Sequence, residues 1–169
     1  MRVVVDDLAF LGSDAIVRPA TARLDPTTPA LRRLEQVGGA AFHERLIVQQ
    51  ELPVGAAVVT GAGGDLPAEF VIHAIIQSQT EAVSHQGVAR AWRSALERAR
   101  ELEFARLSAP PLGTGAGNLA LEDAAEIMVT ELAVHRARFT FPVDVALVVE
   151  TDEEREVFEA ALRKGTTRP

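Results

Sequence analysis

The chain has 169 residues, a length that suits one domain with a substantial core. Hydrophobic residues make up 47% of it, which excludes an intrinsically disordered chain. Lysine and arginine number 17 against 24 acidic residues, and the net charge of −7 argues against a broad nucleic-acid-binding surface. Cysteine is absent, so disulfide bonds and thiolate metal sites are excluded.

The first ten residues lack the basic segment and long apolar stretch of a signal peptide. No apolar run reaches the roughly 20 residues that a membrane-spanning helix needs. We therefore expect a cytoplasmic protein with no membrane association. Without an internal repeat or a low-complexity linker, the sequence predicts a single domain over residues 1–165 and a short C-terminal tail over 166–169.

Six short runs have the composition of β-strands. They lie at residues 1–5, 14–17, 56–60, 70–76, 107–109 and 143–149. Several of these runs are continuously apolar instead of alternating between apolar and polar residues. That pattern is typical of strands buried on both faces, which need helices on both sides of the sheet.

Helical patterns separate the strands. Thr28 and Pro29 form a helix start, with Thr28 as N-cap and Pro29 at the first helical position. Gly38 and Gly39 are predicted to end this helix, and a second helical stretch follows over about 40–49. Apolar residues recur at three- and four-residue spacing through 88–102, which predicts a third helix with Trp92 in the core.

Two more helices complete the pattern. One follows Asn118, and the last begins with a capping box formed by Thr151 and Glu154 and is predicted to stop at Gly165. Strands and helices thus alternate along the chain. We predict an α/β fold, a three-layer α/β/α sandwich with a mixed, mostly parallel six-stranded sheet. In such folds ligands bind beyond the carboxyl ends of the strands.

The most distinctive local motif is the glycine-rich segment 110–118 (PPLGTGAGN), which follows a strand and precedes a helix. Glycines let the backbone approach a ligand closely, and exposed N–H groups near a helix start favour a phosphate or diphosphate. No Lys-Ser or Lys-Thr follows the last glycine, so the segment is not a P-loop. A glycine-rich turn without a ligand remains the alternative. The candidate phosphate-binding residues are Gly113, Thr114, Gly115, Ala116, Gly117 and Asn118.

Other candidate groups are few. No histidine has a partner at metal-ligand spacing, so no metal site and no cofactor are expected, and His73 is predicted to be a buried, hydrogen-bonded core residue. Asp6, Asp7 and Asp14 stand near the ends of the first two strands. A carboxylate there could accept a hydrogen bond from a base amino group or cap a turn, and the residues alone leave both readings open.

Taken together, these segments resemble the macrodomain family along nearly the whole chain. Residues 53–60 (PVGAAVVT) are similar to its Pro-Thr-Gly-x-Ala-x-x-Thr segment, and 66–74 (LPAEFVIHA) to its Leu-Pro-x-x-Tyr-Val-Ile-His-Ala segment. Residues 14–17 (DAIV) resemble the second strand, which usually continues Asn-Ala-Ala-Asn. Residues 111–117 resemble the diphosphate loop, and 122–125 the start of the helix after it.

The resemblance implies a cleft that binds ADP-ribose or a related nucleotide. Asp7 stands at the position of the acid that binds the adenine amino group, and Leu8 stands in for the isoleucine beside it. Asp6 replaces the usual glycine. The resemblance also implies phosphate contacts from the glycine-rich segment, while it leaves homo-oligomerisation open.

The catalytic side of the family's pattern is altered. Arg18 and Thr21 replace the two asparagines, residues 27–30 (TTPA) replace Gly-Gly-Gly-Val, and Leu31 replaces the aspartate of the active hydrolases. Thr21 and Thr28 remain candidate ligand-binding residues. Arg18 is a candidate fork donor to a phosphate, with exposure to solvent or pairing with Asp25 as alternatives. Gly117 and Glu150 stand where aromatic side chains are often found.

Three functions follow from this reading. The first is binding of ADP-ribose or a related adenine nucleotide without the usual hydrolase activity and without catalytic residues of the family's kind. The second is hydrolysis of ADP-ribosyl esters, O-acetyl-ADP-ribose or ADP-ribose 1''-phosphate by a modified mechanism. The third is a non-catalytic scaffold or oligomerisation protein with a decayed site.

Overall fold

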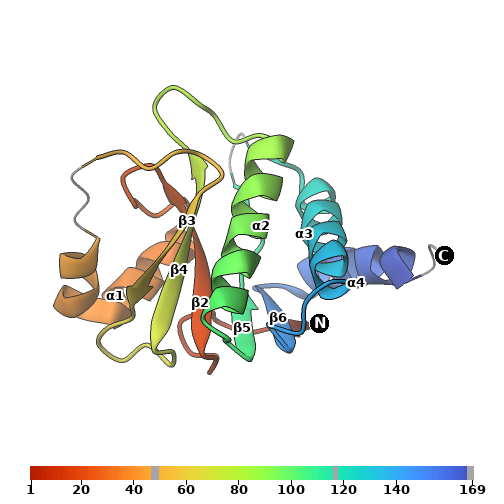
Figure 1. Ribbon diagram of the computed structural model, residues 1–169, viewed down its shortest axis with the longest axis horizontal. Helices are drawn as coiled ribbons and strands as arrows, with labels where there is room; N and C mark the ends of the chain where they lie inside the picture. The colour runs from red at the N-terminus through yellow and green to blue at the C-terminus, as the bar shows by residue number, and fades with distance from the viewer. Residues whose placement is uncertain (47–49, 116–117, 167–169) are drawn as a thin grey trace.

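The computed structural model describes residues 1–46, 50–115 and 118–166. It contains six strands and four helices that alternate along most of the chain (Figure 1). The strands are β1 (Arg2–Val5), β2 (Ala15–Thr21), β3 (Ala57–Gly61), β4 (Phe70–Gln77), β5 (Arg106–Ala109) and β6 (Asp144–Val149). The helices are α1 (Pro29–Arg45), α2 (His85–Glu101), α3 (Leu121–Arg136) and α4 (Asp152–Thr166).

The strands form one sheet in the order β1-β6-β5-β2-β4-β3. All neighbouring pairs are parallel except β3 with β4, which is antiparallel. The predicted fold class, a mixed and mostly parallel six-stranded sheet within an α/β fold, is therefore confirmed. Because five strands run in the same direction, their carboxyl ends meet at one edge of the sheet, where ligands bind in folds of this kind.

Helices cover both faces of the sheet. Ala15 and Val17 on β2 belong to the core cluster that includes Trp92 of α2, Met128 of α3 and Phe158 of α4. The intervening residue Ile16 packs instead with a second cluster that α1 supplies from the opposite face. Successive side chains of a strand point to opposite faces, so β2 is buried between α1 on one side and the other three helices on the other.

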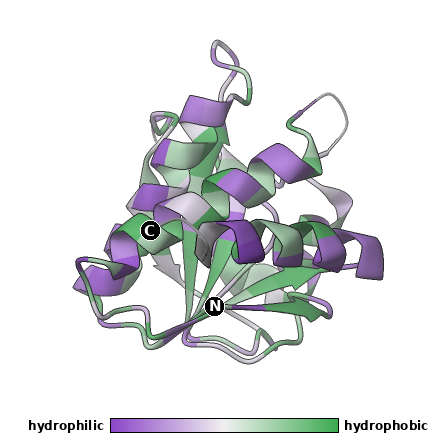
Figure 2. Cartoon of the chain, turned by 90° about the vertical axis from the view of Figure 1, so that its right-hand side faces the viewer, coloured by the Kyte–Doolittle hydropathy of each residue, from purple (hydrophilic) through white to green (hydrophobic). Residues whose placement is uncertain are grey.

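Hydropathy follows these layers. Figure 2 shows the strands largely in the hydrophobic colour, while the helices change between the two colours along their length, as amphipathic helices do. Trp92 is completely buried, and its indole N–H donates to the carbonyl of Met128 at 3.0 Å, which confirms its predicted place in the core. No helix of the described ranges is long and apolar enough to cross a membrane.

The predicted break at Gly38 and Gly39 is confirmed. Gly39 has non-helical backbone angles, with φ at 63° and ψ at −159°, and this kink divides α1 into two helical segments, as predicted for a helix that ends here and a second stretch that starts at Ala40. The predicted end of the second stretch falls on residues 47–49, which lie outside the described residues. The predicted stop of α4 at Gly165 is one residue short, since the helix runs to Thr166.

The predicted capping box at the start of α4 is confirmed. The amide of Glu154 donates to the Thr151 hydroxyl at 3.2 Å, and the Glu154 carboxylate accepts from the Thr151 amide at 3.3 Å. The same carboxylate accepts from the amide of Glu150 at 2.7 Å. These contacts satisfy N–H groups that a helix start leaves without partners, and they fix the backbone directly after β6.

Candidate functional site

A cleft of about 490 Å³ opens at the carboxyl ends of the parallel strands. Its lining comes from segments that are far apart in the sequence: the turn after β1, the start of α1, the loop after β5 and the turn after β6. The volume falls within the range of about 300–1,000 Å³ that is usual for small-molecule sites. The lining residues include Asp7, Leu8, Pro19, Thr28, Leu31, Arg33, Pro111, Thr114, Gly115 and Glu150.

One end of the cleft is charged. Asp7 uses one carboxylate oxygen to accept the amide of Ala9 at 2.9 Å and the other to accept Arg33 Nε at 3.0 Å. Arg33 also donates from Nη2 to Glu150 at 2.7 Å. The hydrogen bond to Glu150 and the negative charge of Asp7 raise the pKa of Arg33 above its ordinary value. Asp7 therefore both shapes its own turn and faces the cleft.

Arg33 is a site residue that the sequence reasoning missed. It stands in α1 three residues after Ala30, which also lines the cleft, and residues three apart lie on the same face of a helix. That spacing from the predicted helix start was the one signal that could have found it. Its carboxylate partners are 26 and 117 residues away in the sequence, so local patterns gave no hint of the contacts.

The glycine-rich loop after β5 supplies another part of the cleft lining. Gly113 and Gly115 have φ values of 79° and 127°, conformations that side-chain-bearing residues rarely adopt. Thr114 and Gly115 line the cleft. Gly113 lies behind them, where a Cβ would come within 2.6 Å of Val88. The predicted contacts of Ala116 and Gly117 lie outside the described residues.

Asn118 shapes this loop through its backbone. Its amide donates to the carbonyl of Gly115 at 3.2 Å, and the amide of Leu119 donates to the carbonyl of Gly113 at 2.9 Å. Neither Asn118 nor Gly113 is among the residues that line the cleft. The structure thus brings Thr114 and Gly115 to the cleft surface and places Gly113 and Asn118 in the support of the loop.

The first turn of α1 faces the cleft across from this loop. Thr28 is at the predicted N-cap position with Pro29 after it, but the Thr28 side chain makes no capping hydrogen bond. The first turn contains no acidic residue, so its positive dipole end is not neutralised locally. A Cβ placed on Gly115 would lie 3.8 Å from Thr28 Cγ2, which puts the helix start and the loop close together. An anion between them would meet N–H groups without needing a lysine.

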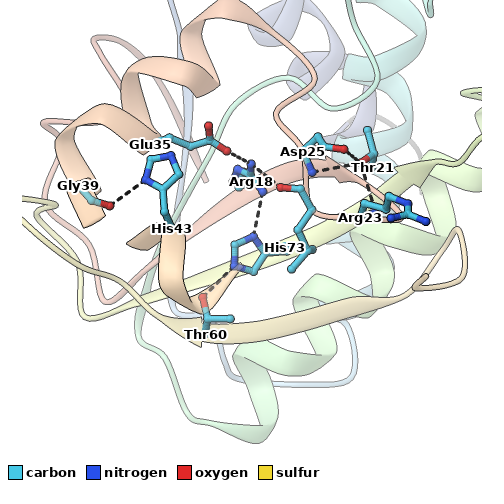
Figure 3. Close-up of polar contacts among 10 residues, drawn as sticks. Arg18, Thr21, Arg23, Asp25, Glu35, Gly39, His43, Thr60 and His73 are labelled. Carbon is cyan, nitrogen blue, oxygen red and sulfur yellow. Dashed lines mark hydrogen bonds and ion pairs between the residues drawn. The ribbon is translucent and has the colours of Figure 1, made fainter. Parts of the chain in front are cut away.

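Arg18 is not in the cleft. Its side chain is completely buried on the α1 face of β2, where Nη2 forms an ion pair with Glu35 and donates to the carbonyl of Leu24 at 2.8 Å (Figure 3). Burial lowers the pKa of Arg18, and the nearby Glu35 carboxylate opposes that lowering. The prediction that Arg18 contacts a phosphate is corrected accordingly, and so are the alternatives of solvent exposure and pairing with Asp25, because the guanidinium is enclosed in the core.

Thr21 is also turned away from the cleft. Its hydroxyl donates to Asp25 at 3.2 Å and accepts from the amide of Asp25 at 3.1 Å (Figure 3). These bonds close the turn after β2, and Thr21 lines a separate small depression with Gln77 and Ser78. The prediction of Thr21 as a ligand-binding residue of the main cleft is therefore corrected as well.

His73 completes the buried polar group around Arg18. Its Nδ1 lies 3.3 Å from Arg18 Nη1, and its Nε2 lies 2.8 Å from the Thr60 hydroxyl. An arginine can only donate, so Nδ1 accepts and Nε2–H donates to Thr60. Burial, together with the positive charge of Arg18, lowers the pKa of His73 to about 3. The prediction of a buried, hydrogen-bonded histidine is confirmed, and this imidazole is neutral at physiological pH.

The titratable side chains of the cleft gather at one end. Among the described residues that line it, these are Asp6, Asp7, Arg33, Glu150 and Glu154. Leu31, whose position corresponds to the hydrolase aspartate, also lines the cleft and is buried in a cluster with Leu8 and Val148. An alkyl side chain can neither accept a proton nor orient water. Asp14 lies at the amino-terminal ends of β2 and β5, away from the cleft. Its carboxylate accepts hydrogen bonds from the amides of Ala105 and Arg106 at 2.9 and 2.8 Å.

No group of three or more histidine, aspartate or glutamate side chains that could hold a metal ion occurs in the part of the chain that the structure describes. The described residues that line the cleft offer carboxylates, one guanidinium, the hydroxyls of Thr28 and Thr114, and backbone N–H groups. Such a set suits recognition of a ligand with hydrogen-bond donors at one end and negative charge at the other.

Comparisons with known proteins agree with this architecture. Two solved structures have the same fold: a macrodomain mutant from Oceanobacillus iheyensis with ADPR and a Trypanosoma brucei macrodomain in complex with ADP-ribose. The TM-scores are 0.82 and 0.84 at 21% and 18% identity. The alignments cover 98% and 95% of this chain, and 93% and 68% of those chains.

Sequence comparisons reach the same family. The chain is 31% identical over 159 residues to a Klebsiella pneumoniae protein named O-acetyl-ADP-ribose deacetylase, with 90% of each chain covered. It is 32% identical to a Mycobacterium tuberculosis protein, of which it spans only 44%. The family model described as Macro domain matches residues 17–128. This chain belongs to the macro domain family.

Proposed function

We propose that the cleft binds ADP-ribose or a closely related adenine nucleotide, without the hydrolytic route of the active enzymes of the family. The observation that carries the proposal is the division of one cleft into two chemically different ends. Asp7 provides carboxylate acceptors at one end, and the start of α1 faces Thr114 and Gly115 at the other. ADP-ribose has the complementary arrangement, an amino-bearing base followed by a diphosphate.

In this proposal each surviving residue has a defined role. The Asp7 carboxylate accepts the adenine amino group, and Leu8 packs beside the base. Thr28 and the first-turn N–H groups of α1 face the diphosphate from one side, and the backbone of Thr114 and Gly115 faces it from the other. Backbone N–H groups at a helix start bind phosphate without a side-chain cation, which fits a cleft with one arginine among its described lining residues.

Calorimetric titration with ADP-ribose tests the proposal, with AMP and ribose 5-phosphate as comparison ligands. Micromolar binding that prefers ADP-ribose over both fragments would support it, since only the intact ligand reaches both ends of the cleft. Absence of binding at millimolar ADP-ribose would refute it. In that case a scaffold role for the fold would be the better hypothesis.

Replacing Asp7 by alanine is expected to weaken ADP-ribose binding by about 5- to 150-fold, the equivalent of roughly 1–3 kcal/mol for a lost charged acceptor. Asp65→Ala is the matched control, because it removes an exposed carboxylate that does not line the cleft, and it should bind ADP-ribose like the wild-type protein. Equal binding by Asp7→Ala and the wild-type protein in calorimetry would show that the base lies elsewhere.

A second function is favoured by one observation, the 31% identity to a protein named O-acetyl-ADP-ribose deacetylase. Against it stand Leu31, which supplies no base, and Thr21, whose hydroxyl is engaged with Asp25 away from the cleft. We expect O-acetyl-ADP-ribose and an ADP-ribosylated glutamate peptide to remain intact at high protein concentration. Multiple turnovers by the wild-type protein in a chromatographic assay, absent from a buffer control, would overturn this expectation.

A further inference from the structure

Arg33 differs from every other residue around the cleft. Among the described lining residues it is the only cation, whereas four acids line the same cleft, and two of them, Asp7 and Glu150, form ion pairs with it. Its side chain remains half-exposed despite two ion pairs, so it is accessible from the cleft. Exposed ion pairs of this kind contribute little to folding stability. We therefore look for the role of these two ion pairs in ligand binding and not in folding stability.

The two carboxylates hold the guanidinium in a defined orientation. Asp7 accepts a hydrogen bond from Nε at 3.0 Å, and Glu150 accepts one from Nη2 at 2.7 Å. The guanidinium is therefore bound in its own plane by residues from two turns, one after β1 and one after β6. A guanidinium is planar and carries five N–H donors, of which these contacts use two. Edge-on hydrogen bonding leaves the flat faces of the group free for stacking.

No aromatic side chain occurs among the described residues that line the cleft. The Arg33 guanidinium is thus the planar, delocalised side chain available next to the Asp7 carboxylate. Arginine stacks on aromatic rings through cation–π and π contacts, which strengthen when water is excluded. The backbone behind this end is fixed too, because Glu150 donates its amide to the Glu154 carboxylate.

We propose that Arg33 is a specificity-determining residue whose guanidinium face forms a wall of the nucleobase pocket, held flat by Asp7 and Glu150. The inference rests on the proposed function, since it assigns the base to the Asp7 end of the cleft. A purine offers the larger face to this wall, and its amino group reaches the carboxylate that also orients Arg33. Asp7 would therefore have two roles: it accepts the amino group of the base, and it orients the Arg33 guanidinium.

The test is calorimetric binding of ADP-ribose to the wild-type protein and to Arg33→Ala, Arg33→Lys and Arg33→Tyr. Loss of the planar face in the alanine and lysine variants should weaken binding about ten-fold, while tyrosine should remain within about three-fold of wild type because it restores a stacking surface. Arg32→Ala is the matched control, an exposed arginine one position away that does not line the cleft. It should bind like wild type.

The outcomes separate the inference from the proposed function. Binding by the lysine variant but not the tyrosine variant would mean that charge matters and would overturn the stacking role. Unchanged or tighter binding by Arg33→Ala would overturn it too, the latter because the ion pairs would then compete with the ligand. If the Arg33 variants give one of these contrary results while wild type binds ADP-ribose and Asp7→Ala weakens that binding, only the Arg33 inference falls. If wild type binds no ADP-ribose, both fall.

Discussion

Glu35→Ala is expected to lower the free energy of unfolding by about 3–5 kcal/mol, because it leaves the buried Arg18 guanidinium without its counter-charge. The other groups in direct contact with the Arg18 guanidinium are neutral, since the Leu24 carbonyl accepts a hydrogen bond and His73 is uncharged. Asp25 attracts the guanidinium electrostatically but forms no ion pair with it, so it replaces little of the Glu35 contact. Its Nε has no hydrogen-bond partner. Since small domains are stable by only about 5–15 kcal/mol, such a loss removes a large share of the total.

Urea unfolding followed by circular dichroism measures this effect. Glu97→Ala is the matched control, since Glu97 pairs with Arg100 on the exposed face of α2 and its loss should cost at most about 1 kcal/mol. The double variant Arg18→Met with Glu35→Met should recover most of the stability, because apolar groups of similar size replace a buried ion pair with little penalty. Equal losses in Glu35→Ala and Glu97→Ala would contradict the prediction.

The second large effect is a dependence of stability on pH that arises from His73. Its folded-state pKa of about 3 lies below the ordinary value of 6.5. Between these two pH values His73 is protonated in the unfolded chain but neutral in the folded protein. The contribution is therefore fully present above about pH 6.5 and is lost as the pH falls toward 3. Between pH 7 and pH 5 we expect a loss of about 2 kcal/mol in the free energy of unfolding.

His73→Gln should abolish most of this slope, whereas the control His43→Gln, at an exposed histidine of α1, should retain it. Comparing slopes cancels the contribution of the amino terminus, whose pKa burial also lowers. An NMR titration gives an independent readout in the wild-type protein, since the ring resonances of His73 should not shift between pH 7 and pH 5. A titrating His73, or equal slopes in both variants, would contradict the assignment.

Much of the fold was predictable because its signals are local. Parallel strands buried on both faces must be continuously apolar, and each of the predicted strands overlaps an observed one. The capping box at Thr151 involves residues three apart. The glycine pair at Gly38 and Gly39 also marks a real break, since Gly39 is non-helical and divides α1 into two segments. What the local pattern could not give is the space available at Gly38, where an added Cβ would come within 2.6 Å of Phe42.

Site residues were predictable only where a sequence motif or the position after a strand or at a helix start fixes their place in the fold. Asp7, Leu8, Thr28, Thr114 and Gly115 reach the cleft because they follow strand ends or begin a helix. Arg18 was misplaced because alternation along β2 shows that it shares a face with Ile16 but not which helix covers that face. Its partner Glu35 is 17 residues away. Arg33 likewise depends on contacts made only after the chain has folded.

The Arg18–Glu35 pair also limits which substitutions this chain tolerates one at a time. A single change of Arg18 to asparagine would leave the mostly buried Glu35 carboxylate without its cationic partner. A single change of Glu35 would leave the buried guanidinium without its paired carboxylate. Each single change is therefore expected to destabilise the protein more than replacement of both residues by apolar ones. The two positions are energetically coupled, so the effect of a substitution at one depends on the residue at the other.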